Sequence, residues 1–181
     1  HSRRGQLHDA VQPGEDYHDA FNISWLNDRN YFEDGQIKEE DFELGSFMSS
    51  KMFHKNVTCT NCHNAHSMKL KFEGNALCLQ CHTPNYNSKA HHFHEENKTG
   101  ANCVDCHMTG KFYMGNDFRH DHSFRIPRPD QSVTYGTPNA CNGCHDDKKV
   151  EWAATTVQKW YGKNRKTHFS DLLLQGWVDG K

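Results

Sequence analysis

Four copies of the pattern Cys-x-x-Cys-His dominate this chain of 181 residues and limit what it can fold into. In this pattern two thiols form thioether bonds to a porphyrin, and the imidazole after the second thiol becomes an axial ligand of its iron. The sequence therefore predicts four haem c cofactors. The cysteines expected to attach them are Cys59, Cys62, Cys78, Cys81, Cys103, Cys106, Cys141 and Cys144, and the adjoining iron ligands are His63, His82, His107 and His145.

Two other uses of paired cysteines compete with haem attachment. Cys62 and Cys78 are separated by 15 residues, which is also a zinc-site spacing. A zinc site made of four cysteines does not need a histidine after each second cysteine, and neither does a disulfide framework or a redox pair. The four histidines therefore favour haem.

The composition is unusual for a globular domain. Leu, Ile, Val and Phe together make up 30 of 181 residues, and the mean hydropathy is -0.98. So few of these residues normally indicate disorder. Disordered chains also tend to carry a high net charge, however, and the formal net charge here is only -2. Four apolar macrocycles would supply the missing core, so we expect the chain without haem to be largely unfolded.

The spacing of the motifs predicts the architecture. We expect a single domain in three parts: a segment without haem motifs, 1–57, that packs on the haem core; a tetrahaem stretch, 58–162, that ends in a covering helix; and a tail, 163–181. Successive motifs start 19, 25 and 38 residues apart, which leaves room for single helical turns and loops but not for a sheet. The expected fold is mostly irregular with short α-helices, organised around stacked haems, with little or no β-sheet.

Local patterns predict the other elements. Segment 36–53 is compatible with a helix that has a solvated acidic face, and the prolines of 108–140 predict an extended arm. A helix capped by Asp147 and ended by Gly162 should cover the last haem, and a short helix should start at Ser170. Membrane spans are not expected because no run of about 18 apolar residues occurs, and without a long Lys/Arg cluster no nucleic acid is expected either.

Eleven histidines lie outside the motifs, and four six-coordinate bis-His haems would use four of them. His66 follows His63 by three residues, so both rings should emerge from one side of a helical turn, and His66 should then reach a different haem. Methionine is the minority alternative as a ligand. We predict as second axial ligands His66, His91, His94 and His122.

The remaining histidines of the two clusters near these ligands have a different expected role. His92 and His120 should lie beside the ligands or be exposed. A carboxylate from Asp117 or Asp121 should orient one ligating ring through its other nitrogen, which is a common arrangement around metal-bound imidazoles.

Several runs of the chain resemble the multihaem c-type cytochromes that are often joined to tetratricopeptide repeats. The similarity extends over roughly residues 30–162, and the runs that carry it are 57–67, 74–82, 91–94, 103–108, 121–130 and 136–145. The resemblance implies periplasmic or extracellular electron transfer by stacked bis-His haems. In that family His1 would follow the second cysteine of a further motif, so His1 is expected to continue such a motif or to bind the haem of a neighbouring copy.

Two functions fit these observations. The first is electron transfer without substrate chemistry, as a carrier or as a subunit of a longer haem wire, with redox proteins or neighbouring copies of the chain as partners in a homo-oligomer or filament. The second is a multihaem reductase of a small nitrogen or sulfur oxyanion at an open haem. Such reductases often carry a Cys-x-x-Cys-Lys variant, which this sequence lacks, so electron transfer is favoured.

Overall fold

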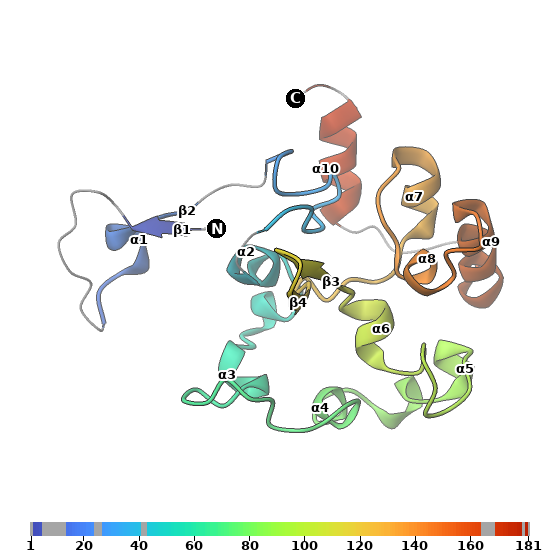
Figure 1. Cartoon of the computed structure of the whole chain (residues 1–181), viewed down its shortest axis with the longest axis horizontal. Coiled ribbons are helices and arrows are strands. Elements are labelled where there is room, and N and C mark those ends of the chain that lie inside the picture. The colour runs from blue at the N-terminus through green and yellow to red at the C-terminus, as the bar shows by residue number, and fades with distance from the viewer. Residues whose placement is uncertain are drawn as a thin grey trace.

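The computed structural model describes residues 2–4, 14–23, 27–40, 43–163, 169–178 and 180. Short helices joined by long loops make up most of it (Figure 1). In chain order the elements are β1 Ser2–Arg4, α1 Tyr17–Ala20, β2 Phe21–Ile23, α2 Glu43–Met48, η1 Phe53–Lys55, α3 Cys59–Cys62, α4 Ala76–Leu79, η2 Pro84–Tyr86, α5 Lys89–His92, α6 Cys103–His107, β3 Gly110–Tyr113, β4 Asp117–His120, α7 Pro129–Tyr135, α8 Ala140–Cys144, α9 Val150–Tyr161 and α10 Phe169–Val178. The expectation of short helices with little sheet is confirmed.

Two two-stranded antiparallel sheets make up the sheet structure of the described residues. Strand β1 pairs with β2, and β3 pairs with β4 so that Gly110 faces His120 and Tyr113 faces Asp117. Met114, Gly115 and Asn116 form the three-residue turn between β3 and β4, with φ 49° at Met114 and φ 77° at Gly115. The prediction that the haem-binding stretch has no room for a sheet is therefore wrong at this hairpin.

The proline-rich segment 108–140 contains a helix as well as the hairpin. The extended arm predicted there is wrong, because Pro129 occupies the first turn of α7, where the missing N–H of proline has no helical partner to lose. The helix ends at Gly136, which adopts φ 74°.

In the earlier segment 36–53, the predicted helix is confined to α2, because Ile37 instead bridges to Tyr31 in a tight loop.

The helix after the last motif is confirmed, with one correction. Helix α9 has Lys149 at its N-cap, whereas Asp147 forms an ion pair with Lys148 at 2.7 Å and does not cap the helix. Gly162 ends α9 as expected, and the helix buries Ala153 and Val157. The helix expected from Ser170 is α10.

A small apolar core is formed by residues outside the four motifs. Tyr31, Ile37 and Tyr113 form its buried apolar cluster, and the described segment around it is linked to the haem-binding stretch by polar contacts. Arg125 Nη2 donates to the Asp34 carbonyl at 2.6 Å, and the Ile37 N–H donates to an Asp121 carboxylate oxygen at 3.3 Å. The segment before the first motif therefore packs against the chain that follows the third motif.

Candidate functional site

Each Cys-x-x-Cys-His motif lies on or next to a single helical turn. The His63 N–H donates to the Cys59 carbonyl at 2.8 Å, and His82 and His145 make the same bond to the first cysteine of their own motifs. A polar side chain caps the turn of the fourth motif, since Asn139 Oδ1 accepts from the Asn142 N–H at 3.0 Å. One turn therefore presents two thiols three residues apart on one face, and none of the eight cysteines forms a disulfide.

Successive motifs are in contact with each other. Gln80 Nε2 donates to the Asn61 carbonyl at 3.5 Å, which links the second motif to the first. Asn75 links the second motif to the third, since its side chain donates to the Ala101 carbonyl at 2.9 Å and accepts from the Cys103 N–H at 2.8 Å. Helix α6 of the third motif contacts α8 of the fourth. The motifs thus follow one another in space as they do in sequence.

The thiols of adjacent motifs influence each other's pKa. A hydrogen bond between Cys78 and Cys103 lowers the pKa of Cys103 to about 7 and raises that of Cys78. Burial, followed by the nearby Cys141 thiol, raises the pKa of Cys106 to about 11. The thiols of successive motifs are therefore close neighbours in space, from the second motif to the third and from the third to the fourth.

Three motif histidines each face a histidine from another part of the chain. The ring centres are 6.4 Å apart for His63 and His122, with an angle of 33° between the ring planes. Two further pairs have nearly the same separation: His107 with His91, at 6.1 Å and 10°, and His145 with His94, at 6.3 Å and 32°. Directly stacked rings would be about 3.5–4 Å apart, so the two rings of each pair are near each other without being in stacking contact.

Hydrogen bonds at Nδ1 fix the orientation of several of these rings. His63 Nδ1 donates to the Met68 carbonyl at 2.8 Å, and His107 Nδ1 donates to the Arg125 carbonyl at 2.8 Å. His94 Nδ1 bonds the His92 carbonyl. A carbonyl can only accept, so these nitrogens carry the proton, and the lone pair of each ring lies on Nε2.

The protonation of the paired rings depends on their surroundings. Burial lowers the pKa of His91, and the neighbouring His107 lowers it further. Burial also lowers the pKa of His107, although its bond to the Arg125 carbonyl opposes this effect. Both rings are therefore neutral at neutral pH, which is the form that binds a metal.

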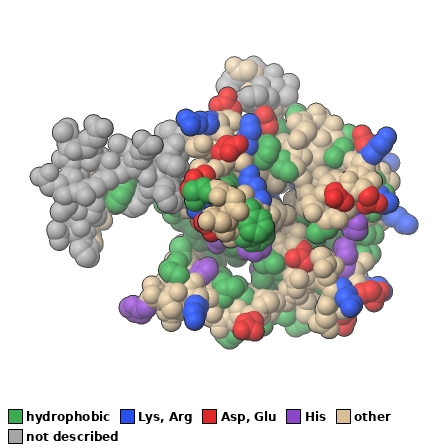
Figure 2. Space-filling view, viewed as in Figure 1, with side chains coloured by type: hydrophobic (Ala, Val, Ile, Leu, Met, Phe, Trp, Pro, Cys, Tyr) green, Lys and Arg blue, Asp and Glu red, His purple; other side chains and the backbone are tan. Residues whose placement is uncertain are grey.

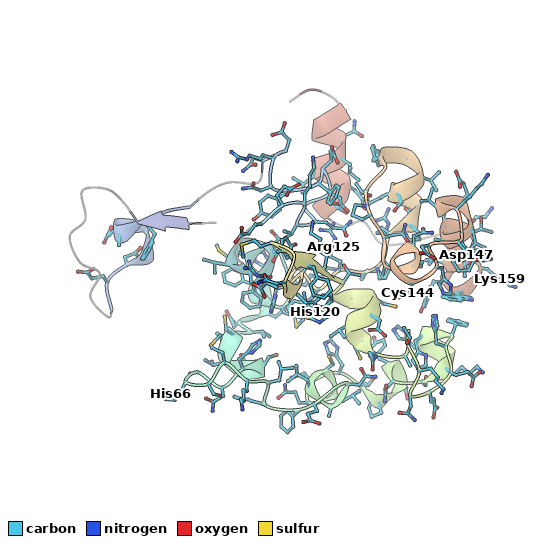
Figure 3. The ribbon with its side chains drawn as sticks, viewed as in Figure 1. His66, His120, Arg125, Cys144, Asp147 and Lys159 are labelled. Atoms are coloured by element: carbon cyan, nitrogen blue, oxygen red, sulfur yellow. The ribbon has the colours of Figure 1, made fainter. Side chains whose placement is uncertain are left out.

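The other predicted ligands are placed differently. His66 is exposed and points away from the molecule at the edge of the loop after α3 (Figure 3). Its predicted helical relation to His63 is wrong, because α3 ends at Cys62 and His63 is extended at φ -107°. Within the described part of the chain, the ring of His82 contacts that of Tyr86, with ring centres 6.2 Å apart and an angle of 79° between the ring planes. His1 lies outside the described residues.

The sequence predicts that His120 and His92 lie beside the ligands or are exposed. Each of them forms a hydrogen bond with one of the paired histidines. His120 Nδ1 donates to the Met108 carbonyl at 2.6 Å, and its own carbonyl accepts from His122 Nδ1 at 2.9 Å. The His94 N–H donates to His92 Nδ1 at 3.2 Å. The two histidines therefore help to position the ring of a neighbouring histidine.

The carboxylate that orients a paired ring comes from an unexpected place. Asp117 pairs with Arg119 and Asp121 caps the Ser123 N–H, so neither fills the predicted role. Glu43, from α2, instead accepts from His122 Nδ1 at 2.8 Å. Burial disfavours charge on His122, but the hydrogen bond and the charge of Glu43 outweigh it and raise the pKa of His122. No local signal indicates this contact, because the two residues are 79 positions apart.

The surroundings of the motifs suit a large apolar group. Leu70 and Phe72, after the first motif, are 53% and 48% exposed, and Figure 2 shows a hollow between the run of α3 and α4 and the elements opposite, with histidines at its rim. Among the described residues, no three Cys, His, Asp or Glu side chains converge as a metal site, whereas a closed zinc site needs four ligands. Pairs of imidazoles beside exposed apolar side chains fit the faces and edges of a porphyrin.

Comparison with known proteins supports this interpretation. Residues 52–87, which contain the first two motifs, match the family model of the doubled CXXCH motif. The outer cell wall cytochrome OcwA has a similar structure, with a TM-score of 0.59 and 14% sequence identity over 83% of this chain and 45% of that chain. This chain thus spans less than half the length of that cytochrome. No curated protein matches the sequence significantly. The resemblance to multihaem c-type cytochromes is confirmed in motif and in fold.

Proposed function

We propose that this chain, which shares the motifs and the fold of multihaem c-type cytochromes, transfers electrons through four covalently attached haems. The observation that carries the proposal is the recurrence of one geometry at three motifs. Each of these motif histidines faces a second imidazole with ring centres 6.1 to 6.4 Å apart.

That separation matches two imidazoles bound to one iron. Two metal–imidazole bonds of about 2 Å each and two ring radii of about 1.1 Å put the ring centres about 6 Å apart when the rings approach from opposite faces. His122, His91 and His94 would then be the second ligands for the irons on His63, His107 and His145. The second ligand of the iron on His82 stays a prediction from the sequence, with His66 and His1 as candidates.

The chain's own residues would hold and insulate the redox centres. The eight thiols fix each porphyrin covalently, and the Nδ1 bonds to the Met68, Arg125 and His92 carbonyls keep three ligating rings oriented. Bound haem supplies an iron couple that accepts and releases one electron at a time. Because successive motifs are in contact, they would bring successive haems close together, as electron exchange along the chain requires.

The proposed setting is outside the cytoplasm, with redox proteins or further copies of the chain as partners. In the described part of the chain no helix is long and apolar enough to cross a membrane. The structural relative is an outer cell wall cytochrome, which agrees with a periplasmic or extracellular location for this chain.

The test is a spectroscopic redox titration of the full chain with its haems attached. We expect four one-electron steps and rhombic low-spin EPR signals, since the paired rings are within 33° of parallel. His91→Ala should convert one iron to high spin, whereas His54→Ala, at an exposed histidine outside the pairs, should convert none. Low-spin iron throughout His91→Ala would contradict the ligand pairing. Turnover of nitrite or hydroxylamine at a high-spin iron of the unmodified chain would favour the reductase.

A further inference from the structure

The contact between Glu43 and His122 distinguishes one haem centre from the others. Glu43 lies in α2, before the first motif, and His122 lies after the β3–β4 hairpin, so the contact joins the two parts of the chain. His122 Nδ1 donates to Glu43 Oε2 at 2.8 Å, and the Glu43 and His122 side chains are only 32% and 25% exposed. A hydrogen bond to a carboxylate in this partly buried position is stronger than one at the surface.

The partner of Nδ1 differs in kind between the centres. Backbone carbonyls accept from His63, His107 and His94, and a carbonyl is neutral. His122 Nδ1 shares its proton between two acceptors: the His120 carbonyl at 2.9 Å, as at the other centres, and in addition the Glu43 carboxylate at 2.8 Å. The nearby cation Arg119 is paired with Asp117 at 2.7 Å and lies 3.8 Å from Glu40, and the charge of Glu43 also contributes to raising its pKa, so Arg119 offsets part of the field of Glu43.

A carboxylate at Nδ1 makes the ligating imidazole more basic. It draws the proton of Nδ1 toward itself, so that Nε2 donates more electron density to the metal, and its charge further stabilises the more positive iron. Both effects favour ferric over ferrous iron. They therefore act in the same direction on the reduction potential, which should fall.

We propose that Glu43 is a positioning residue that lowers the reduction potential of the haem held between His63 and His122, and so sets its place in the order of reduction. The inference rests on the proposed function, because it requires His122 to be an iron ligand. It assigns to the segment before the first motif a part in tuning a haem that the segment does not itself attach.

Glu43→Gln in the full chain with haems attached is the direct test. The amide keeps the size of the side chain and an oxygen that can accept from His122, but removes the charge. One of the four midpoint potentials should rise, the other three should stay, and every iron should keep its spin state. Glu43→Asp keeps the charge and should leave the potential nearer to that of the unmodified chain.

Glu40→Gln is the matched control, because it removes the same charge from a residue that contacts Arg119 instead of His122. Unchanged potentials in Glu43→Gln, or the same rise in Glu40→Gln, would overturn the inference. His122→Ala separates the two proposals. If His122→Ala has a new high-spin iron but Glu43→Gln leaves the potentials unchanged, only the role of Glu43 is contradicted. If every iron of His122→Ala stays low-spin, the assignment of His122 as an iron ligand is itself contradicted.

Discussion

Replacing Gly100 by alanine should dislodge one predicted iron ligand without touching any motif. Gly100 is buried and adopts φ 89°, and its α-carbon faces the ring of His94. A Cβ atom added there would lie 2.5 Å from His94 Cδ2 and 2.8 Å from Nε2. The ring is held by the bond from its Nδ1 to the His92 carbonyl and by the neighbouring ring of Trp160, so the methyl group must displace it.

The size of the displacement follows from the contact distance. Carbon atoms in ordinary contact are about 3.5 Å apart, so the His94 ring must retreat by roughly 1 Å. Metal–nitrogen bonds tolerate a change of only about 0.2 Å, so coordination through Nε2 should be lost. Overpacking costs about 1–3 kcal/mol, and a non-glycine residue at positive φ costs about 1–2 kcal/mol more.

Low-temperature EPR and optical spectra of the haem-loaded protein measure the outcome. Gly100→Ala should convert up to one iron in four to high spin and open it to carbon monoxide, with all haems still covalently bound. Gly136→Ala is the control, because Gly136 adopts φ 74° and has no atom within 4 Å of the added methyl group. Gly136→Ala should lower the free energy of unfolding only by the cost of a non-glycine residue at positive φ, and every iron should stay low-spin.

The reasoning fails if Gly100→Ala keeps the spectrum of the unmodified chain and loses no more stability than Gly136→Ala. Equal high-spin fractions in the two variants would also refute it, since the effect would then come from backbone strain and not from contact with His94.

Three further predictions concern the cofactors, the packing of α9 and the remaining iron. The intact mass of the protein should exceed that of the chain by four haems, and Cys141→Ser should weaken the attachment of one haem. A mass equal to that of the chain plus zinc would contradict the prediction of haem. Trp160→Ala removes a ring stack on Phe93 at 4.4 Å and should lower the free energy of unfolding by about 1–3 kcal/mol, as thermal unfolding would measure. His66→Ala should leave haem attached but convert one iron to high spin, and spectra indistinguishable from those of His54→Ala would show that His66 is not a ligand.

Local chemistry explains which features the sequence predicts well. The helix over 150–161 follows from apolar spacing and Gly162, and the turn at the fourth motif is capped by the side chain of Asn139 just before it. The hairpin β3–β4 was missed because Phe112 and Phe118, which pack against each other across it at 5.1 Å, lie among residues with no clear alternation. The sequence pattern does not predict helix α7, because the prolines of this segment favour an extended chain, although Pro129 occupies the first turn, where a helix accepts proline.

The sequence by itself determines the four candidate sites of haem attachment, because each thiol pair and its imidazole lie within five consecutive residues and need only one helical turn to act together. Tertiary structure decides which second imidazole faces each motif. His63 and His122, or His145 and His94, are brought together only by the path of the chain between them, and no local pattern encodes that path. The same holds for Glu43, whose carboxylate meets His122 because α2 packs beside the loop after β4. Such contacts depend on the packing of the whole chain.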